Sequence, residues 1–124
     1  MSTSHAESTR RAHKAVTTIA IEDMSNSLKG LLGPKLMAYT VGASERTCDR
    51  WIAGANTPNL DAERRLRCAY QIFELLKPVD SSTVIRAWFM GMNPQLDDLS
   101  PAEAIRGDQL RESILAARAF ATGG

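Results

Sequence analysis

The sequence predicts an all-α fold, a compact helical bundle, and three features of the chain support this expectation. Apolar residues recur at the helical period, whereas the every-second-residue alternation of half-buried strands is almost absent. Glycine and proline fall where such helices would begin or end. The 124 residues leave room for one domain, or for one small core with a helical extension.

The first part of the chain predicts two helices separated by glycine and proline. Helical periodicity begins around Val16, and Gly30 and Gly33 are expected to close this first helix. A second, short helix is expected over Pro34–Val41, because proline suits the first helical turn, where the missing N–H has no helical partner. Gly42 can then adopt positive φ and end this helix in a tight turn.

A third helix is expected from Ser44 to about Ala53, with Gly54 as its stop. The Ser44 hydroxyl can cap it by accepting a hydrogen bond from an unpartnered backbone N–H. One face of this helix is apolar and should pack on the first two helices, so the opposite, polar face is left outside. The residues of the apolar face are Cys48, Trp51 and Ile52.

The longest periodic stretch, Leu60–Leu76, predicts a fourth helix that ends at Lys77-Pro78. Asp80 or Ser81 is expected to cap a fifth helix. Its bulky residues, Trp88 and Phe89, are expected to close the core over the fourth helix.

Two local signals organise the end of the chain. Asn93-Pro94 predicts a turn. Ser100-Pro101-Ala102-Glu103 predicts a helix start with a capping box, in which Ser100 and Glu103 satisfy each other's backbone N–H groups. A last helix is expected from Asp108 to about Phe120, ending at Gly123-Gly124.

The composition of the chain limits which binding partners and which cellular location are expected. The formal net charge is +1, so any DNA binding must come from a local patch, doubled in a homodimer. No apolar run approaches the roughly 20 residues that span a bilayer, and Met1–Thr9 leads into no apolar segment of a secretory signal. Cys48 and Cys68 lack metal-ligand spacing and are expected to be buried or half-buried, reduced thiols. We therefore expect a cytoplasmic protein with no membrane partner.

The two short helices around Gly42 have the lengths of a DNA-reading helix-turn-helix, whose second helix enters the major groove. Arginines at Arg46 and Arg50 can contact guanine or neutralise phosphates, and a helix N-terminus can hold a phosphate. Two acidic residues on the same face would either accept from cytosine N4 or pair with arginines. The alternative is a three-helix core whose polar face meets only solvent. The candidate DNA contacts are Ser44, Glu45, Arg46, Thr47, Asp49, Arg50, Arg64 and Arg65.

Two segments resemble known families. The run Ser44, Thr47, Cys48, Trp51 and Gly54 is similar to the Ser-x-x-Thr-φ-x-x-Trp-x-x-Gly pattern of Xre/Cro-type recognition helices, where φ is an apolar residue. The C-terminal segment resembles the toxin-binding domain of MbcA/ParS/Xre antitoxins, on the residues Trp88-Phe89-Met90-Gly91-Met92-Asn93-Pro94-Gln95-Leu96 and Ser100-Pro101-Ala102-Glu103-Ala104-Ile105-Arg106. Asp97-Asp98-Leu99 and Ile105-Arg106 differ from that family's usual Gly-Gly-x and Leu-Leu.

The order of these segments is that of antitoxins paired with RES-domain toxins, which degrade NAD. The composition of residues 1–15 predicts a polar, basic tail. The resemblance implies a helix-turn-helix domain over 16–77 and a toxin-binding domain over 78–124. It also implies that the C-terminal end occludes the toxin's active site, and that the protein represses its own operon by binding operator DNA as a homodimer or as a hetero-oligomer with the toxin. The candidate toxin contacts are Met90, Met92, Arg118, Phe120 and Gly124.

No catalytic set is recognisable in the sequence, and we expect no enzyme activity, no metal and no cofactor. The only histidines, His5 and His13, lie in the polar N-terminal region, and the chain has neither a glycine-rich phosphate loop nor a nucleophile elbow. Two other functions remain open. One is an Xre-family transcriptional repressor without a toxin partner, and the other is a helical adaptor whose helix-turn-helix serves only packing.

Overall fold

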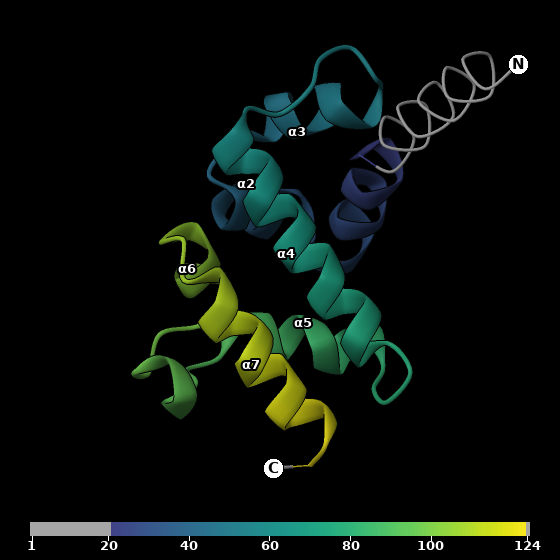
Figure 1. The fold of residues 1–124 in the computed structure, drawn as a ribbon. Coiled ribbons are helices and arrows are strands. Elements are labelled where there is room, and N and C mark those ends of the chain that lie inside the picture. Colours follow the sequence, from purple (N-terminus) through teal and green to yellow (C-terminus); the bar gives the residue numbers. More distant parts are fainter. Residues whose placement is uncertain (1–20, 124) are drawn as a thin grey trace, which may run out of the picture.

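The computed structural model describes residues 21–123, and every regular element in this range is helical, which confirms the predicted all-α class (Figure 1). A helix over residues 21–32 comes first. The elements that follow it are α2 (Pro34–Val41), α3 (Glu45–Ile52), α4 (Leu60–Leu76), α5 (Ser82–Met90), the 3-10 helix η1 (Pro94–Leu96), α6 (Pro101–Arg106) and α7 (Leu110–Ala121). The predicted start at Val16 and the basic tail lie outside the described residues.

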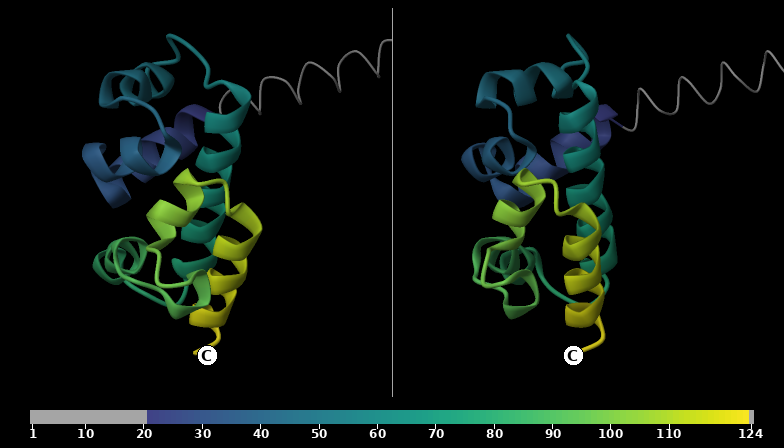
Figure 2. Two further views of the ribbon diagram at one scale, coloured as in Figure 1. Left: turned by 90° about the vertical axis from the view of Figure 1, so that its left-hand side faces the viewer. Right: turned by 60° about the vertical axis from the view of Figure 1, so that its left-hand side comes forward.

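The long helix α4 runs through the molecule and organises two groups of helices around it (Figures 1 and 2). At one end lie the helix over residues 21–32, α2 and α3. At the other lie α5, η1 and the C-terminal end of α7, which packs along α4. The short helix α6 contacts α2, α5 and α4, so it links the two groups alongside α4.

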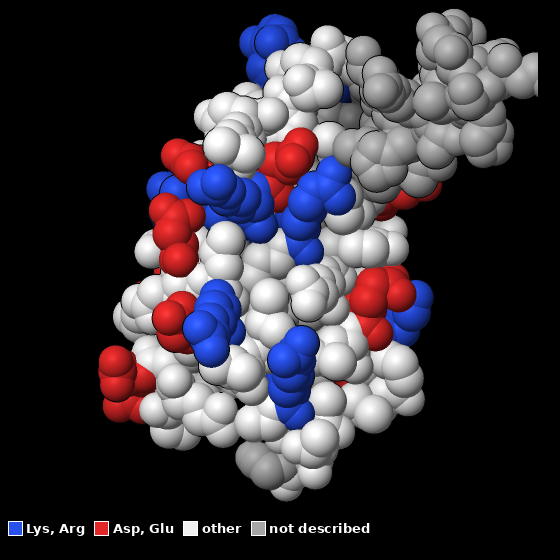
Figure 3. Space-filling view, viewed as in Figure 1, with Lys and Arg blue, Asp and Glu red and all other residues white. Residues whose placement is uncertain are grey.

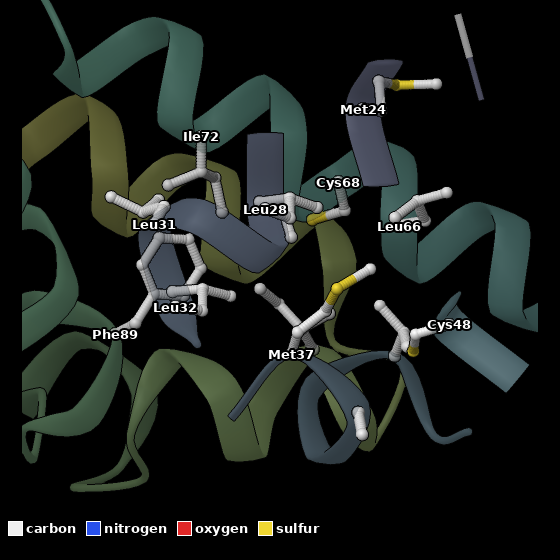
Figure 4. Packing of buried hydrophobic residues seen from close by; sticks show 14 of the residues in the cluster. Met24, Leu28, Leu31, Leu32, Met37, Cys48, Leu66, Cys68, Ile72 and Phe89 are labelled. Carbon is white, nitrogen blue, oxygen red and sulfur yellow. The ribbon is translucent and has the colours of Figure 1, made fainter. Parts of the chain in front are cut away.

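The two groups share one hydrophobic core (Figure 4). Leu28 and Met37 come from the first group, Leu66 and Ile72 from α4, and Phe89 from α5, and all five side chains are fully buried. Each large apolar side chain buried in this way contributes about 1.5–3 kcal/mol relative to an exposed one. The core is therefore a reason for the two groups to fold together.

The helix starts follow the predicted capping residues. The hydroxyl of Ser44 accepts a hydrogen bond from the backbone N–H of Thr47 at 3.0 Å. Ser100 and Glu103 form the predicted capping box, with backbone N–H to side-chain oxygen distances of 3.0 and 3.1 Å. Of the two residues proposed to cap the fifth helix, Ser81 is the cap, and its hydroxyl accepts from the backbone N–H of Val84.

Two predicted helix boundaries were wrong. Gly30 does not close the first helix but lies within it, exposed, and a Cβ added there would meet no atom within 4 Å; the helix ends at Gly33, where φ is +82°. The cost of about 1 kcal/mol for a mid-helix glycine is outweighed by the burial of the neighbouring leucines. The last helix begins at Leu110, because Asp108 adopts a left-handed φ of +66°. The turn at Asn93-Pro94 continues as the 3-10 helix η1.

Burial agrees with most of the predicted core. Cys48 and Cys68 are buried free thiols, as expected. Phe89 is fully buried, but Trp88 is only partly buried and packs at the edge of the core. None of the described helices combines the length and the apolar character that crossing a bilayer requires.

Candidate nucleic-acid interface and C-terminal groove

A three-residue turn joins α2 to α3. Gly42 adopts φ +73° and ψ +38°, the left-handed conformation in which a side chain would be strained. The backbone N–H groups of Gly42 and Ala43 both donate to the carbonyl oxygen of Ala38 at 3.0 Å, which closes α2. Ser44 follows in extended conformation and caps α3. This local chemistry fixes the direction in which α3 leaves the turn.

The two faces of α3 differ as the sequence predicted. Cys48 and Trp51 are 2% exposed and pack into the core, while Ile52 is half-buried. The opposite face projects the four charged residues of the helix, all exposed: Glu45, Arg46, Asp49 and Arg50. Neither arginine forms an ion pair with another described residue, so both guanidinium groups can bind a partner.

The acidic residue Asp49 has a partner that the sequence did not reveal. The ammonium group of Lys29, in the helix over residues 21–32, donates to a carboxylate oxygen of Asp49 at 2.8 Å. Both side chains are substantially exposed, so the pair contributes little to stability. Its electrostatic effect is still relevant, because Lys29 offsets a negative charge on the face that would meet phosphates.

Hydrogen bonds between neighbouring residues pair the polar groups of Ser44 and Thr47 at the start of α3. Besides accepting from the Thr47 backbone N–H, the Ser44 hydroxyl donates to the Thr47 hydroxyl oxygen at 2.9 Å. The Thr47 hydroxyl keeps its own hydrogen for another acceptor. A phosphate oxygen at this helix start would therefore find a hydroxyl donor beside exposed Arg46.

The arginines of α4 lie in different environments. Arg64 is exposed. Arg67 pairs with Glu63 one helical turn earlier, at 3.5 Å. The side chain of Arg65 is only 18% exposed and binds Asp108 through two hydrogen bonds, which raises the pKa of Arg65 and lowers the pKa of Asp108. Of the two α4 residues predicted to touch DNA, only Arg64 is without such an internal partner among the described residues.

The face seen in Figure 3, over α4, α6 and α7, carries mixed charge. Basic and acidic groups alternate in its upper part, and its lower part is largely uncharged with isolated basic and acidic groups. This face offers no broad basic field. A nucleic-acid contact on this face would therefore depend on single basic side chains.

A shallow groove of about 300 Å³ lies at the other end of the molecule. Trp88 and Phe120 line it with ring centroids 6.1 Å apart, and Met92, which is 81% exposed, lines it too. Met90 and Arg118 are also exposed. The full lining comprises Trp88, Met92, Asn93, Pro94, Gln95, Ala116 and Phe120. Two of the predicted toxin contacts, Met92 and Phe120, thus share one groove, while Gly124 lies outside the described residues.

A larger open hollow of about 620 Å³ was missed by sequence reasoning. It lies between the helix over residues 21–32 and α4, and is lined by Asp23, Met24, Arg67, Tyr70, Gln71 and Glu74. A hydrogen bond from the Tyr70 hydroxyl to Glu74 raises the pKa of Tyr70. Four of its lining residues share one face of α4 at helical spacing, a signal that the sequence carried, but the packing of the helix over residues 21–32 beside that face was visible only in the structure. Within residues 21–123, no three His, Cys, Asp or Glu side chains are grouped to hold a metal ion.

Comparison of the chain with known protein families, with curated proteins and with solved structures found no match.

Proposed function

We propose that this protein is an antitoxin with two working surfaces: the exposed face of α3 binds operator DNA, and the C-terminal groove binds a toxin. The observation that carries the proposal is that the two surfaces lie at opposite ends of one shared core (Figures 1 and 2). A toxin in the groove would leave α3 accessible, so one copy could hold both partners.

The geometry of α3 supports the DNA-binding part. A recognition helix needs a buried face that anchors it and an opposite face of donors that reach base edges. Cys48 and Trp51 provide the anchor, and exposed Arg46 and Arg50 provide paired donors suited to guanine O6 and N7. Arg64 would contact the phosphate backbone without reading sequence. A homodimer would present two such helices to two half-sites.

The C-terminal groove supports the toxin-binding part. Exposed aromatic and methionine side chains are adaptable apolar contacts, and aromatic anchors dominate the energetics of protein interfaces. Met92 and Phe120 line the groove, with Met90 exposed nearby in sequence. The arginine at Arg118 is exposed and offers a planar donor pair for a phosphate group.

The resemblance of the two segments to Xre antitoxins supports the identity of the partner. The proposed toxin is a RES-type, NAD-degrading enzyme, and the mechanism is steric occlusion of its active site by the C-terminal part of this chain. The residues that would perform the occlusion are Arg118, Phe120 and the segment over residues 121–124. The protein itself would carry out no reaction.

The toxin-binding proposal is tested by purifying the tagged chain from its native cell and assaying what accompanies it. The expected result is a stoichiometric protein that consumes NAD once it is released. Met92→Glu or removal of Phe120–Gly124 should abolish both co-purification and inhibition. Val79→Glu is the matched control, because Val79 is another exposed apolar residue, 52% exposed, outside the groove. Recovery of the chain alone, with specific DNA binding intact, would replace the proposal with a repressor that lacks a toxin.

The DNA-binding proposal is tested by gel-shift titration of the upstream region of the gene. Arg46→Ala or Arg50→Ala should weaken specific binding by about 1–3 kcal/mol for each lost base contact. Arg111→Ala is the control, because Arg111 is an exposed arginine on α7, away from α3. If the unaltered protein binds DNA and none of the variants differs from it, α3 does not read DNA. If the unaltered protein shows no salt-sensitive binding to DNA, the adaptor function replaces the proposal.

A further inference from the structure

The C-terminal end of α2 needs partners that α2 does not supply. The last four carbonyl groups of an α-helix accept no hydrogen bond from within the helix, and together they form the negative end of its dipole. Basic side chains in the last turn often neutralise this end, but α2 has none there. The carbonyl oxygen of Ala38 accepts hydrogen bonds from the backbone N–H groups of Gly42 and Ala43 in the turn. The backbone N–H of Gly42 also donates to the carbonyl oxygen of Tyr39, at 3.2 Å. The carbonyls of Tyr39 and Val41 receive further donors from distant parts of the chain.

Two arginines from other helices bind these carbonyls. Arg106, the last residue of α6, donates from Nη1 to the carbonyl oxygen of Tyr39 at 2.7 Å. Its guanidinium group also lies over the Tyr39 ring, 4.6 Å from the centroid. Arg65 of α4 donates from Nη1 to the carbonyl oxygen of Val41 at 3.4 Å. Both positive charges therefore lie at the negative end of α2, where they are favourable.

Asp108 holds Arg65 in this position. Its two carboxylate oxygens accept from Nε and Nη2 of Arg65 at 2.9 and 3.0 Å, which leaves Nη1 directed to Val41. Such paired hydrogen bonds fix the plane of a guanidinium group. Asp108 lies in the α6–α7 connection and adopts a left-handed φ of +66°. The orientation of Arg65 thus depends on the conformation of that connection.

The turn before α3 leaves space for Arg65. A Cβ atom added to Gly42 would lie 2.6 Å from Nη1 of Arg65, so a side chain at this position would displace the guanidinium group. Gly42 therefore serves two needs, positive φ and space for Arg65. The arginine, the glycine and the start of α3 form one structural unit.

We propose that Arg65 and Arg106 are positioning residues: they cap α2 from the C-terminal half of the fold and thereby set the turn that aims α3. The α6–α7 connection would then regulate the DNA-facing helix, because a change that moves Asp108 or Arg106 releases the end of α2. This inference rests on the proposed function for its consequence at DNA. It assigns Arg65 a role different from the phosphate contact that the sequence predicted.

The positioning itself is tested without DNA, by amide hydrogen exchange on the intact chain. Arg106→Ala should raise exchange about tenfold at Gly42, Ala43 and Thr47, the equilibrium effect of losing one charge-assisted hydrogen bond. Amides of α7 should keep their rates. Arg106→Lys should restore part of the protection, and Arg111→Ala, which removes an exposed arginine from α7, should change neither region. A uniform rise across all helices, or no change at the turn, would overturn the proposal.

The consequence for DNA is tested by measuring affinity for a duplex of about 20 base pairs as a function of NaCl concentration. A phosphate contact by Arg65 predicts that Arg65→Ala lowers the salt slope by about one, and that Asp108→Asn frees the arginine and tightens binding. Positioning predicts that both variants weaken binding and leave the slope unchanged. Asp98→Asn is a matched control, because Asp98 is also exposed and has φ +65°.

The two experiments separate the two proposals. If the unaltered protein does not bind DNA, the proposed function fails, and hydrogen exchange alone decides whether the arginines position the turn. If DNA binding is present but follows the phosphate-contact pattern, the positioning of α3 by Arg65 is wrong while the DNA-binding proposal stands.

Discussion

The guanidinium group of Arg106 donates a 2.7 Å hydrogen bond to the carbonyl oxygen of Tyr39, 67 residues earlier in the chain. This contact joins the end of α6 to the end of α2, and with it the C-terminal helices to the turn that precedes α3. The same guanidinium group lies over the Tyr39 ring, 4.6 Å from its centroid. Arg106 therefore contacts both the backbone and the side chain of one residue near the end of α2.

Replacement of Gly42 by alanine should destabilise the protein by about 1–3 kcal/mol. The cost has two sources: a left-handed conformation for a residue with a side chain, and displacement of Arg65 by the new Cβ. Urea denaturation measures the change. Gly123→Ala is the control, because Gly123 has φ +76° but no atom within 4 Å of a Cβ. Equal effects of the two substitutions would show that the Arg65 contact contributes nothing.

Replacement of Gly30 by alanine should stabilise the protein, in contrast to the replacement of Gly42. Gly30 is exposed within the helix over residues 21–32, and an added Cβ meets no atom within 4 Å. Alanine restricts the unfolded chain and favours the helix, so the free energy of unfolding should rise by about 0.5–1 kcal/mol. Thermal unfolding followed by circular dichroism measures it. A decrease would mean that the helix needs conformational freedom at this position.

The two phenylalanines that contact Trp88 should respond differently to truncation. Phe89 is fully buried, and Phe89→Ala should cost about 3–5 kcal/mol through lost burial and a cavity. Phe120 is 37% exposed, so Phe120→Ala should lower the free energy of unfolding by only about 1 kcal/mol, mostly through the lost contact with Trp88. Chemical denaturation of both variants makes the comparison. A large loss for Phe120→Ala would assign that ring to the core rather than to a binding surface.

Stability should fall in alkaline solution because of the two buried thiols. Burial raises the pKa of Cys48 to about 11 and of Cys68 to about 12, both above the ordinary value of 9.0. The unfolded thiols ionise first, so the stability that comes from keeping them protonated is complete below about pH 9 and is lost progressively above it. Denaturation midpoints between pH 8 and pH 11 should fall less steeply in Cys68→Ala than in the unaltered chain. Identical slopes would contradict the assignment.

The described helices and their caps follow from local sequence. Ser44, Ser81 and the Ser100–Glu103 pair act on backbone groups three positions away, so adjacency in the chain is enough to predict their hydrogen bonds. The apolar face of α3 was predictable for the same reason, because helical spacing decides which residues share a face. Gly30 was misjudged because a weak local preference was outweighed by the burial of its leucine neighbours in the tertiary core.

The partners of the charged side chains were decided only by the tertiary structure. Asp49 pairs with Lys29 rather than with an arginine of its own helix, and Arg65 binds Asp108 rather than remaining free for a phosphate. These pairs join residues 20 and 43 positions apart. A long charged side chain forms an ion pair with whichever opposite charge the packing of the helices brings within about 3–4 Å. The helical period of the sequence does not predict which charged groups lie that close. The sequence by itself therefore determined the helices and their buried faces, whereas helix packing determined which arginines point to the solvent.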